Sequence, residues 1–162
     1  MKNTKLSAAT AALQFLTQHQ ATFVLCPYPY QEHGGTANSS QALGVDEHIV
    51  IKTLIMQDEL ARPLVVLMHG DKKVSTKALA RQAKVKSIEP CKIEVAQRHT
   101  GYLVGGTSPF ATKKSMPVYV EESILALPEI YINGGQRGLL VRIAPQLLTQ
   151  LLSAIPVQCA ID

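Results

Sequence analysis

The sequence predicts one α+β (mixed α/β) domain with a largely antiparallel sheet and helices packed around it. Apolar runs of strand length alternate along the chain with stretches whose apolar residues recur at helical spacing. Several connections between these runs are too short for the helical crossover that parallel neighbours require. A length of 162 residues, of which 46% are hydrophobic, suits a single domain over residues 1–162 with one substantial core.

The first third of the chain predicts a helix, a strand and a loop. Residues 7–19 carry a mainly apolar stripe at helical spacing, and residues 22–26 form a short apolar run typical of a strand. Residues 28–40 are rich in proline, glycine, asparagine and serine, which predicts a loop. We expect Ser39 or Ser40 to cap a short helix that Gly44 ends.

A lysine interrupts the next apolar run, His48–Met56, which predicts a strand. Alternate side chains of a strand share a face, so Lys52 lies with the apolar residues at positions 50, 54 and 56. Lysine is seldom buried without a partner, because removing water from the ammonium is costly. The position therefore indicates a cavity that holds an anion, a carbonyl or a phosphate. An edge strand whose lysine reaches solvent is the alternative.

A second strand and a charged helix follow. Residues 63–68 predict the strand, and the chain is expected to turn back directly after it. Ser75 is expected to cap a helix that runs to about Lys84, on which Lys77, Arg81 and Lys84 share one face. Such a cationic face suits a nucleic-acid backbone, and a solvated helix face is the alternative.

The C-terminal half predicts further strands between two helices. We expect a short helix at residues 92–97, strands at 118–120, 129–132 and 139–143, and a last helix with Pro145 in its first turn. Asn133, Gly134 and Gly135 are expected to form the tight turn between the last two strands. A turn does not account for the nearby Arg137, which could pair with an acid or a phosphate.

The glycine-rich segment 101–109 is a candidate site. The neighbouring Gly105 and Gly106 let a backbone come close to a ligand and could aim amide N–H groups at an oxyanion. Thr107 and Ser108 add hydroxyls, and Pro109 stiffens the exit. An ordinary turn is the alternative, and the spacing fits neither a Walker loop nor a Rossmann fingerprint.

Composition argues against several other classes. A net charge of +4 permits a polyanionic partner without requiring one, and few aromatic residues argue against a stacking platform for bases. Five histidines without metal-ligand spacing predict no metal site, and an inert thiol explains Cys26 better than a nucleophile does. Three widely spaced cysteines, no signal peptide and no membrane-spanning run predict a soluble cytoplasmic protein without a membrane partner.

Four stretches occur in the order in which one known family has them. They are Ile51–Leu54, Ala96–Pro109 (AQRHTGYLVGGTSP), the Lys113-Lys114 pair ahead of Pro117, and Tyr131–Gly138. On these motifs the chain resembles the YbaK/EbsC family of free-standing aminoacyl-tRNA editing domains, which includes Cys-tRNA(Pro) deacylases. It is also similar to the editing domain inserted in bacterial prolyl-tRNA synthetases. The resemblance covers about residues 7–155, nearly the whole chain.

The resemblance implies a twisted mixed sheet, nearly barrel-shaped, with flanking helices. It also implies hydrolysis, without metal or organic cofactor, of the ester between a wrong amino acid and the 3′ adenosine of a tRNA. The family's lysine falls on Lys52 and its GxxxP loop on residues 105–109, which implies catalytic roles for Lys52, Gly105 and Gly106. The expected substrate-binding residues are Tyr28, Thr53, Thr107, Ser108, Pro109, Asn133, Gly134, Gly135 and Arg137.

The chain departs from the family at two pocket positions and in one segment. Members of the Cys-tRNA(Pro) type have a serine at Asn133 and an aspartate at Leu140, and the segment 28–45 is longer here. Cys-tRNA(Pro) is the first expected substrate, with Ala-tRNA(Pro) or another small mischarged amino acid next. Aminoacyl-tRNA, above all tRNA(Pro), is the implied partner, and a complex with prolyl-tRNA synthetase stays open. A non-catalytic tRNA- or synthetase-binding module and an unrelated small-molecule hydrolase are the alternatives.

Overall fold

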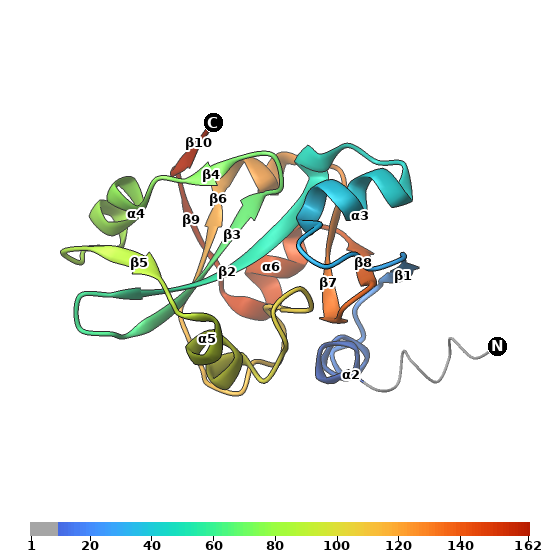
Figure 1. The fold of residues 1–162 in the computed structure, drawn as a ribbon, viewed down its shortest axis with the longest axis horizontal. Coiled ribbons are helices and arrows are strands. Elements are labelled where there is room, and N and C mark those ends of the chain that lie inside the picture. Colours follow the sequence, from blue (N-terminus) through green and yellow to red (C-terminus); the bar gives the residue numbers. More distant parts are fainter. Residues whose placement is uncertain (1–9) are drawn as a thin grey trace.

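The computed structural model describes residues 10–162, which fold around an eight-stranded sheet (Figure 1). The strands run in the order β1-β8-β7-β2-β3-β6-β9, and β5 pairs with β2 beside β7. A separate two-stranded ribbon joins β4 and β10. The bounds are β1 Val24–Pro27, β2 Val50–Asp58, β3 Pro63–His69, β4 Lys73–Val74, β5 Ile88–Pro90, β6 Val118–Glu121, β7 Ile130–Gln136, β8 Leu139–Ile143, β9 Ile155–Val157 and β10 Ala160–Ile161.

Five of the eight strand pairings within the described residues are antiparallel. The parallel ones join β2 to β7, β3 to β6, and β6 to β9. The predicted α+β class with a largely antiparallel sheet is therefore confirmed.

The helices begin and end mostly where local sequence signals place them. They are α2 Ala11–Gln18, α3 Gly35–Leu43, α4 Thr76–Ala83, α5 Ile93–Thr100 and α6 Gln146–Leu152, with short 3-10 turns η1 Glu47–Ile49 and η2 Glu122–Ala126. The Ser75 hydroxyl accepts a hydrogen bond from the Ala78 amide at 3.1 Å, which confirms it as the N-cap of α4. Residues 7–9 of the first predicted helix lie outside the described residues. No helix in the described part of the chain is long and apolar enough to cross a membrane.

The loop expected at residues 28–40 is wrong over its second half. Helix α3 starts at Gly35, and the Ser39 and Ser40 hydroxyls donate to carbonyls within the helix instead of capping it. The Thr36 hydroxyl anchors the helix by donating to Glu47 at 2.7 Å. Tertiary contacts thus override a composition with weak helix propensity, whereas Gly44 ends the helix in the left-handed region as predicted.

The expected hairpin turn at residues 133–135 is also wrong. Strand β7 continues to Gln136, and its pairing with β8 shifts between Asn133 and Gln136, so these residues form a β-bulge. The Asn133 side-chain oxygen accepts from the amides of Gly135 at 2.7 Å and Gln136 at 3.1 Å. The bulge therefore keeps its backbone amides satisfied, and the turn moves to Arg137 and Gly138, where Gly138 has a φ of 81°.

The two faces of β2 border different cores. On one face Ile51 and Ile55 belong to the main cluster, to which α2, α5 and α6 also contribute. On the other face Met56 belongs to the cluster beneath α4, and Val50 to a small cluster beside α3. Alternation along the strand places Lys52 on this second face, at the break between its two clusters.

Candidate functional site

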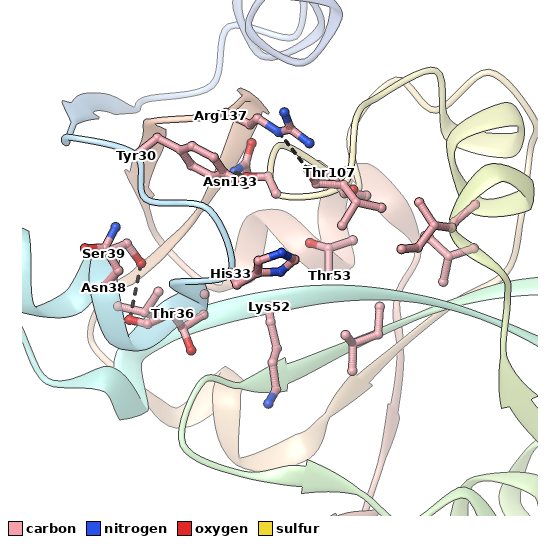
Figure 2. A pocket seen from close by; sticks show the side chains of 18 of the residues that line it. Tyr30, His33, Thr36, Asn38, Ser39, Lys52, Thr53, Thr107, Asn133 and Arg137 are labelled. Atoms are coloured by element: carbon pink, nitrogen blue, oxygen red, sulfur yellow. Dashed lines mark hydrogen bonds between the residues drawn. The ribbon is translucent and has the colours of Figure 1, made fainter.

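A cavity of about 800 Å³ opens along the edge of β2 where that strand lacks a partner (Figure 2). Strand β7 pairs with β2 at residues 50–51, β5 pairs with it at residues 56–58 and the Cys91 amide bonds the Ile55 carbonyl, so residues 52–54 are unpaired on that side. The segment 28–39, α5 and the loop 104–107 supply the rest of the wall. The volume falls within the roughly 300–1,000 Å³ typical of small-ligand sites.

Thr53 presents polar groups to this open edge. The Gly70 amide donates to the Val50 carbonyl on the β3 side, and the Cys91 amide donates to the Ile55 carbonyl on the opposite side. Because backbone groups alternate sides along a strand, the N–H and C=O of Thr53 point toward the cavity. Its hydroxyl oxygen is buried and, among the described residues, has no hydrogen-bond partner. A polar ligand could use the two backbone groups directly, and the hydroxyl once its side chain rotates toward the cavity.

Lys52 leaves β2 on the opposite side from Thr53 (Figure 2). It lines the cavity, and its ammonium donates to the Gly70 carbonyl at 3.3 Å. Burial lowers the pKa of Lys52, while the carboxylates of Glu47 and Asp71 act in the opposite sense. The lysine is thus half-buried with one long hydrogen bond to the protein, which a ligand oxygen could replace.

Gly106 does not offer the amide that the sequence suggested. Its N–H donates to the Leu103 carbonyl at 2.8 Å, so this donor is already used within the loop. A Cβ at Gly106 would lie 2.7 Å from the Arg137 backbone nitrogen, which shows that the loop packs directly on the hairpin. The expected oxyanion role of Gly106 is therefore corrected to one of close packing. The amides of Gly105 and Thr107 donate no hydrogen bond within residues 10–162, and both residues line the cavity.

Asn133 and Arg137 hold the loop in place. The Asn133 side-chain amide donates to the Gly105 carbonyl at 3.1 Å, and Arg137 Nε donates to the Val104 carbonyl at 3.0 Å. The Arg137 guanidinium also lies over the Tyr30 ring, 5.3 Å from its centroid. Both residues line the cavity. The sequence suggested an acid or a phosphate as the partner of Arg137, whereas in this structure its partners are the Val104 carbonyl and the Tyr30 ring.

The cavity brings together seven of the twelve predicted site residues. They are Tyr28, Lys52, Thr53, Gly105, Thr107, Asn133 and Arg137. The other five, Gly106, Ser108, Pro109, Gly134 and Gly135, do not line it. Ser108 is fully buried and its hydroxyl accepts from the Phe110 amide at 3.0 Å, while Gly135 borders a smaller cavity of about 450 Å³ behind the loop.

The sequence analysis missed the contribution of the α3 segment. Tyr30, His33, Thr36 and Asn38 all line the cavity, and Figure 2 shows the His33 ring pointing into it. His33 has a φ of 62°, a left-handed conformation that is uncommon for a residue other than glycine. The adjacent pair of glycines at 34–35 was a signal for such a tight path, but the segment was predicted as plain loop.

Two other chemistries fit these residues poorly. Ligand atoms of His48, His69 and Asp71 lie within 4.8 Å of one another, but the two imidazole rings stack 3.8 Å apart and 5° from parallel. Lone pairs in parallel planes cannot converge on one ion, and both nitrogens of His69 already bond, to the His48 carbonyl and the Ser123 hydroxyl. Burial raises the pKa of Cys26, which disfavours a thiolate nucleophile.

Comparisons with known proteins point to one family. The model of the family described as the aminoacyl-tRNA editing domain matches residues 32–151. A protein of Enterococcus faecalis named "Putative Cys-tRNA(Pro)/Cys-tRNA(Cys) deacylase EbsC" is 27% identical over 152 residues, which cover 93% of each chain.

Solved structures share the fold. One, described as the "Crystal structure of a putative trans-editing enzyme for prolyl tRNA synthetase", superposes with a TM-score of 0.80 at 21% identity, covering 92% of this chain and 94% of its own. Another, of a hypothetical protein, has a TM-score of 0.84 at 23% identity, with coverages of 91% and 97%.

Proposed function

The chain belongs to the aminoacyl-tRNA editing domain family, and we propose that it acts in translation fidelity as a trans-editing deacylase. Its substrate would be a mischarged tRNA, first of all Cys-tRNA(Pro). The observation that carries the proposal is the cavity in which the open edge of β2, with Lys52 and Thr53, borders the same space as the Gly105–Thr107 loop. That space suits the terminal adenosine with its attached amino acid.

The loop amides are suited to the ester carbonyl. As a nucleophile attacks the carbonyl carbon, negative charge builds up on the carbonyl oxygen, and fixed N–H groups stabilise it. The amides of Gly105 and Thr107 are the available donors, and the Asn133 bond to the Gly105 carbonyl keeps the loop from turning away. Water supplies the nucleophile, the bond from the carbonyl carbon to the ribose oxygen breaks, and the ribose oxygen takes up a proton.

Lys52 and Thr53 are suited to the nucleotide part of the substrate. The Thr53 hydroxyl, which lacks a partner among the described residues, would bond a terminal ribose hydroxyl. Lys52 would exchange its 3.3 Å contact with the Gly70 carbonyl for a ribose oxygen or the adjacent phosphate. Because such an ester is already labile, orientation and charge stabilisation would suffice without a strong general base.

Two observations bear on the amino acid. The name of the E. faecalis relative supports cysteine, whose thiol could attack its own ester carbonyl in place of water. The bond to the ribose oxygen would then break, that oxygen would take up the thiol proton, and a cyclic thioester would leave. Leu140 lines the cavity and supports a small apolar side chain, so alanine is the second candidate. The solved structure described as that of a "putative trans-editing enzyme for prolyl tRNA synthetase" supports tRNA(Pro) as the tRNA and prolyl-tRNA synthetase as a partner.

A panel of four substrates tests the proposal: Cys-tRNA(Pro), Ala-tRNA(Pro), Pro-tRNA(Pro) and Cys-tRNA(Cys). We expect the wild-type protein to release the amino acid from Cys-tRNA(Pro) fastest and to spare Pro-tRNA(Pro). Preference for Ala-tRNA(Pro) would reassign the amino acid. Binding of tRNA without hydrolysis of any species would contradict the proposal and favour a binding module.

A further inference from the structure

We propose that the single-stranded 3′ end of the tRNA reaches the cavity across a surface formed by Arg98, Lys113 and Lys114, with its phosphates on these three cations. We call this the α5 surface, because it lies at the C-terminal end of α5. The inference rests on the proposed function in one respect, namely that the ligand is an aminoacyl-tRNA.

The backbone holds the three cations together. The Lys113 amide donates to the Thr100 carbonyl at 3.1 Å, and the Lys114 amide donates to the His99 carbonyl at 2.8 Å, so the lysine segment is fixed to the end of α5. All three cationic side chains belong to exposed residues. Burial, followed by the charges of Lys114 and Arg98, lowers the pKa of His99, which places both cations within electrostatic reach of its ring.

The three cations are available for an outside anion. None of the four ion pairs among the described residues includes any of them. Like charges held side by side repel one another, and a phosphate chain relieves that repulsion while releasing its own counterions.

Helix α5 connects the α5 surface to the cavity, whose lining includes Gln97 but none of the three cations. Gln97, next to Arg98, lines the cavity. Its side-chain oxygen accepts a hydrogen bond from the Val104 amide at 3.0 Å, which ties α5 to the start of the Gly105–Thr107 loop. Ile93 is 62% exposed, Val104 is 39% exposed and both line the cavity, so an apolar rim borders the same opening. A strand of RNA leaving the cavity would lay sugar and base faces on this rim and phosphates on the cations.

The cationic face of α4 is less well placed. Lys77, Arg81 and Lys84 are exposed as the sequence predicted, but no residue of α4 lines the cavity. Figure 1 shows α4 and α5 on different sides of β5. The phosphates nearest the scissile ester must lie close to the cavity, which favours the α5 surface over α4.

The salt dependence of tRNA binding tests this directly. The variant Arg98→Gln/Lys113→Gln/Lys114→Gln is compared with Lys77→Gln/Arg81→Gln/Lys84→Gln, which removes the same charge from α4. For single-stranded contacts each phosphate adds about 0.7 to the slope of log K against log salt, so the α5 variant should lose about 2. The α4 variant should lose less than half as much. An unchanged slope in the α5 variant, or equal losses in both variants, would overturn the proposal.

Two further measurements keep the outcome clear. The single variant Arg98→Gln, in an exposed side chain, should lose about 0.7 of the slope if the triple variant folds poorly. Hydrolysis of an aminoacyl-adenosine, which lacks the phosphates, should be equal in wild type and the α5 variant. If the wild type hydrolyses no aminoacyl ester, the proposed function fails, while the binding slopes still decide where tRNA lies.

Discussion

Replacing Thr53 by valine separates stability from activity. Valine keeps the shape of threonine and removes only the hydroxyl, which is buried without a partner among the described residues. An unsatisfied buried polar group costs about 1–3 kcal/mol, so its removal should raise the free energy of unfolding by about 1 kcal/mol. In a chain of this length, that raises Tm by about 2–4 °C.

Activity should change in the opposite direction. If the Thr53 hydroxyl bonds the substrate, its loss removes a hydrogen bond of about 0.5–1.5 kcal/mol, and kcat/KM should fall about 2- to 13-fold. The matched control is Thr100→Val, because the Thr100 hydroxyl is buried and satisfied by the Ala96 carbonyl at 2.9 Å and the Tyr102 amide at 3.1 Å.

Thermal unfolding by circular dichroism and steady-state deacylation provide the two readouts. Thr100→Val should lower the free energy of unfolding by about 1–3 kcal/mol. A Thr53→Val protein that is destabilised like the control, or that is more stable with unchanged kcat/KM, would refute the role of this hydroxyl.

Three further predictions concern the loop and the fold. Gly106→Ala places a Cβ 2.7 Å from the Arg137 backbone nitrogen, which displaces the loop. The value of kcat/KM should therefore fall on the order of 100-fold. Activity within about twofold of wild type would contradict this packing. Asn133→Ala removes the hydrogen bond to the Gly105 carbonyl and the acceptor for the amides of Gly135 and Gln136. Urea unfolding should show a free energy of unfolding lower by about 1–3 kcal/mol. Unchanged stability would count against these hydrogen bonds. Burial lowers the pKa of His69 in the folded protein, so the imidazole of the unfolded chain is protonated first as the pH falls. The free energy of unfolding should therefore decrease as the pH drops below about 6.5. Replacing His69 by glutamine should flatten that dependence, and equal pH slopes in both proteins would exclude His69 as its source.

Local signals in the sequence were sufficient for many elements. The serine before α4, the glycine after α3 and the apolar runs of β2 and β3 act through residues a few positions away, and the structure confirms all of them. The alternation around Lys52 also holds, because the period of a strand does not depend on its neighbours.

Long-range contacts decide what the sequence could not predict. Helix α3 forms in a glycine- and serine-rich segment because Thr36 bonds Glu47 and the helix packs beside β2. The bulge in β7 depends on where β8 pairs, which no local pattern contains. Strands β5, β9 and β10 have two or three residues each, which is too few to show the alternation of apolar and polar residues that is typical of a strand.

The candidate site shows the same limit. Adjacent glycines indicate a close approach of the backbone to a neighbour, but they do not show whether that neighbour is a ligand or another strand. At Gly106 the neighbour is the hairpin, and the direction of its amide is set by the turn that closes on Leu103. His33 was missed because its place in the cavity wall depends on the path of the chain into α3.

The most direct test of the account is deacylation by Lys52→Ala, with Lys73→Ala as a matched control at an exposed position. The substrate in this assay is the mischarged tRNA that the wild type hydrolyses fastest. Losing a charge-assisted contact of about 1.5–3 kcal/mol should lower kcat/KM about 10- to 150-fold. The fold should persist, because the only hydrogen bond of the ammonium among the described residues is the one to Gly70. Full activity in a folded Lys52→Ala protein would contradict the account.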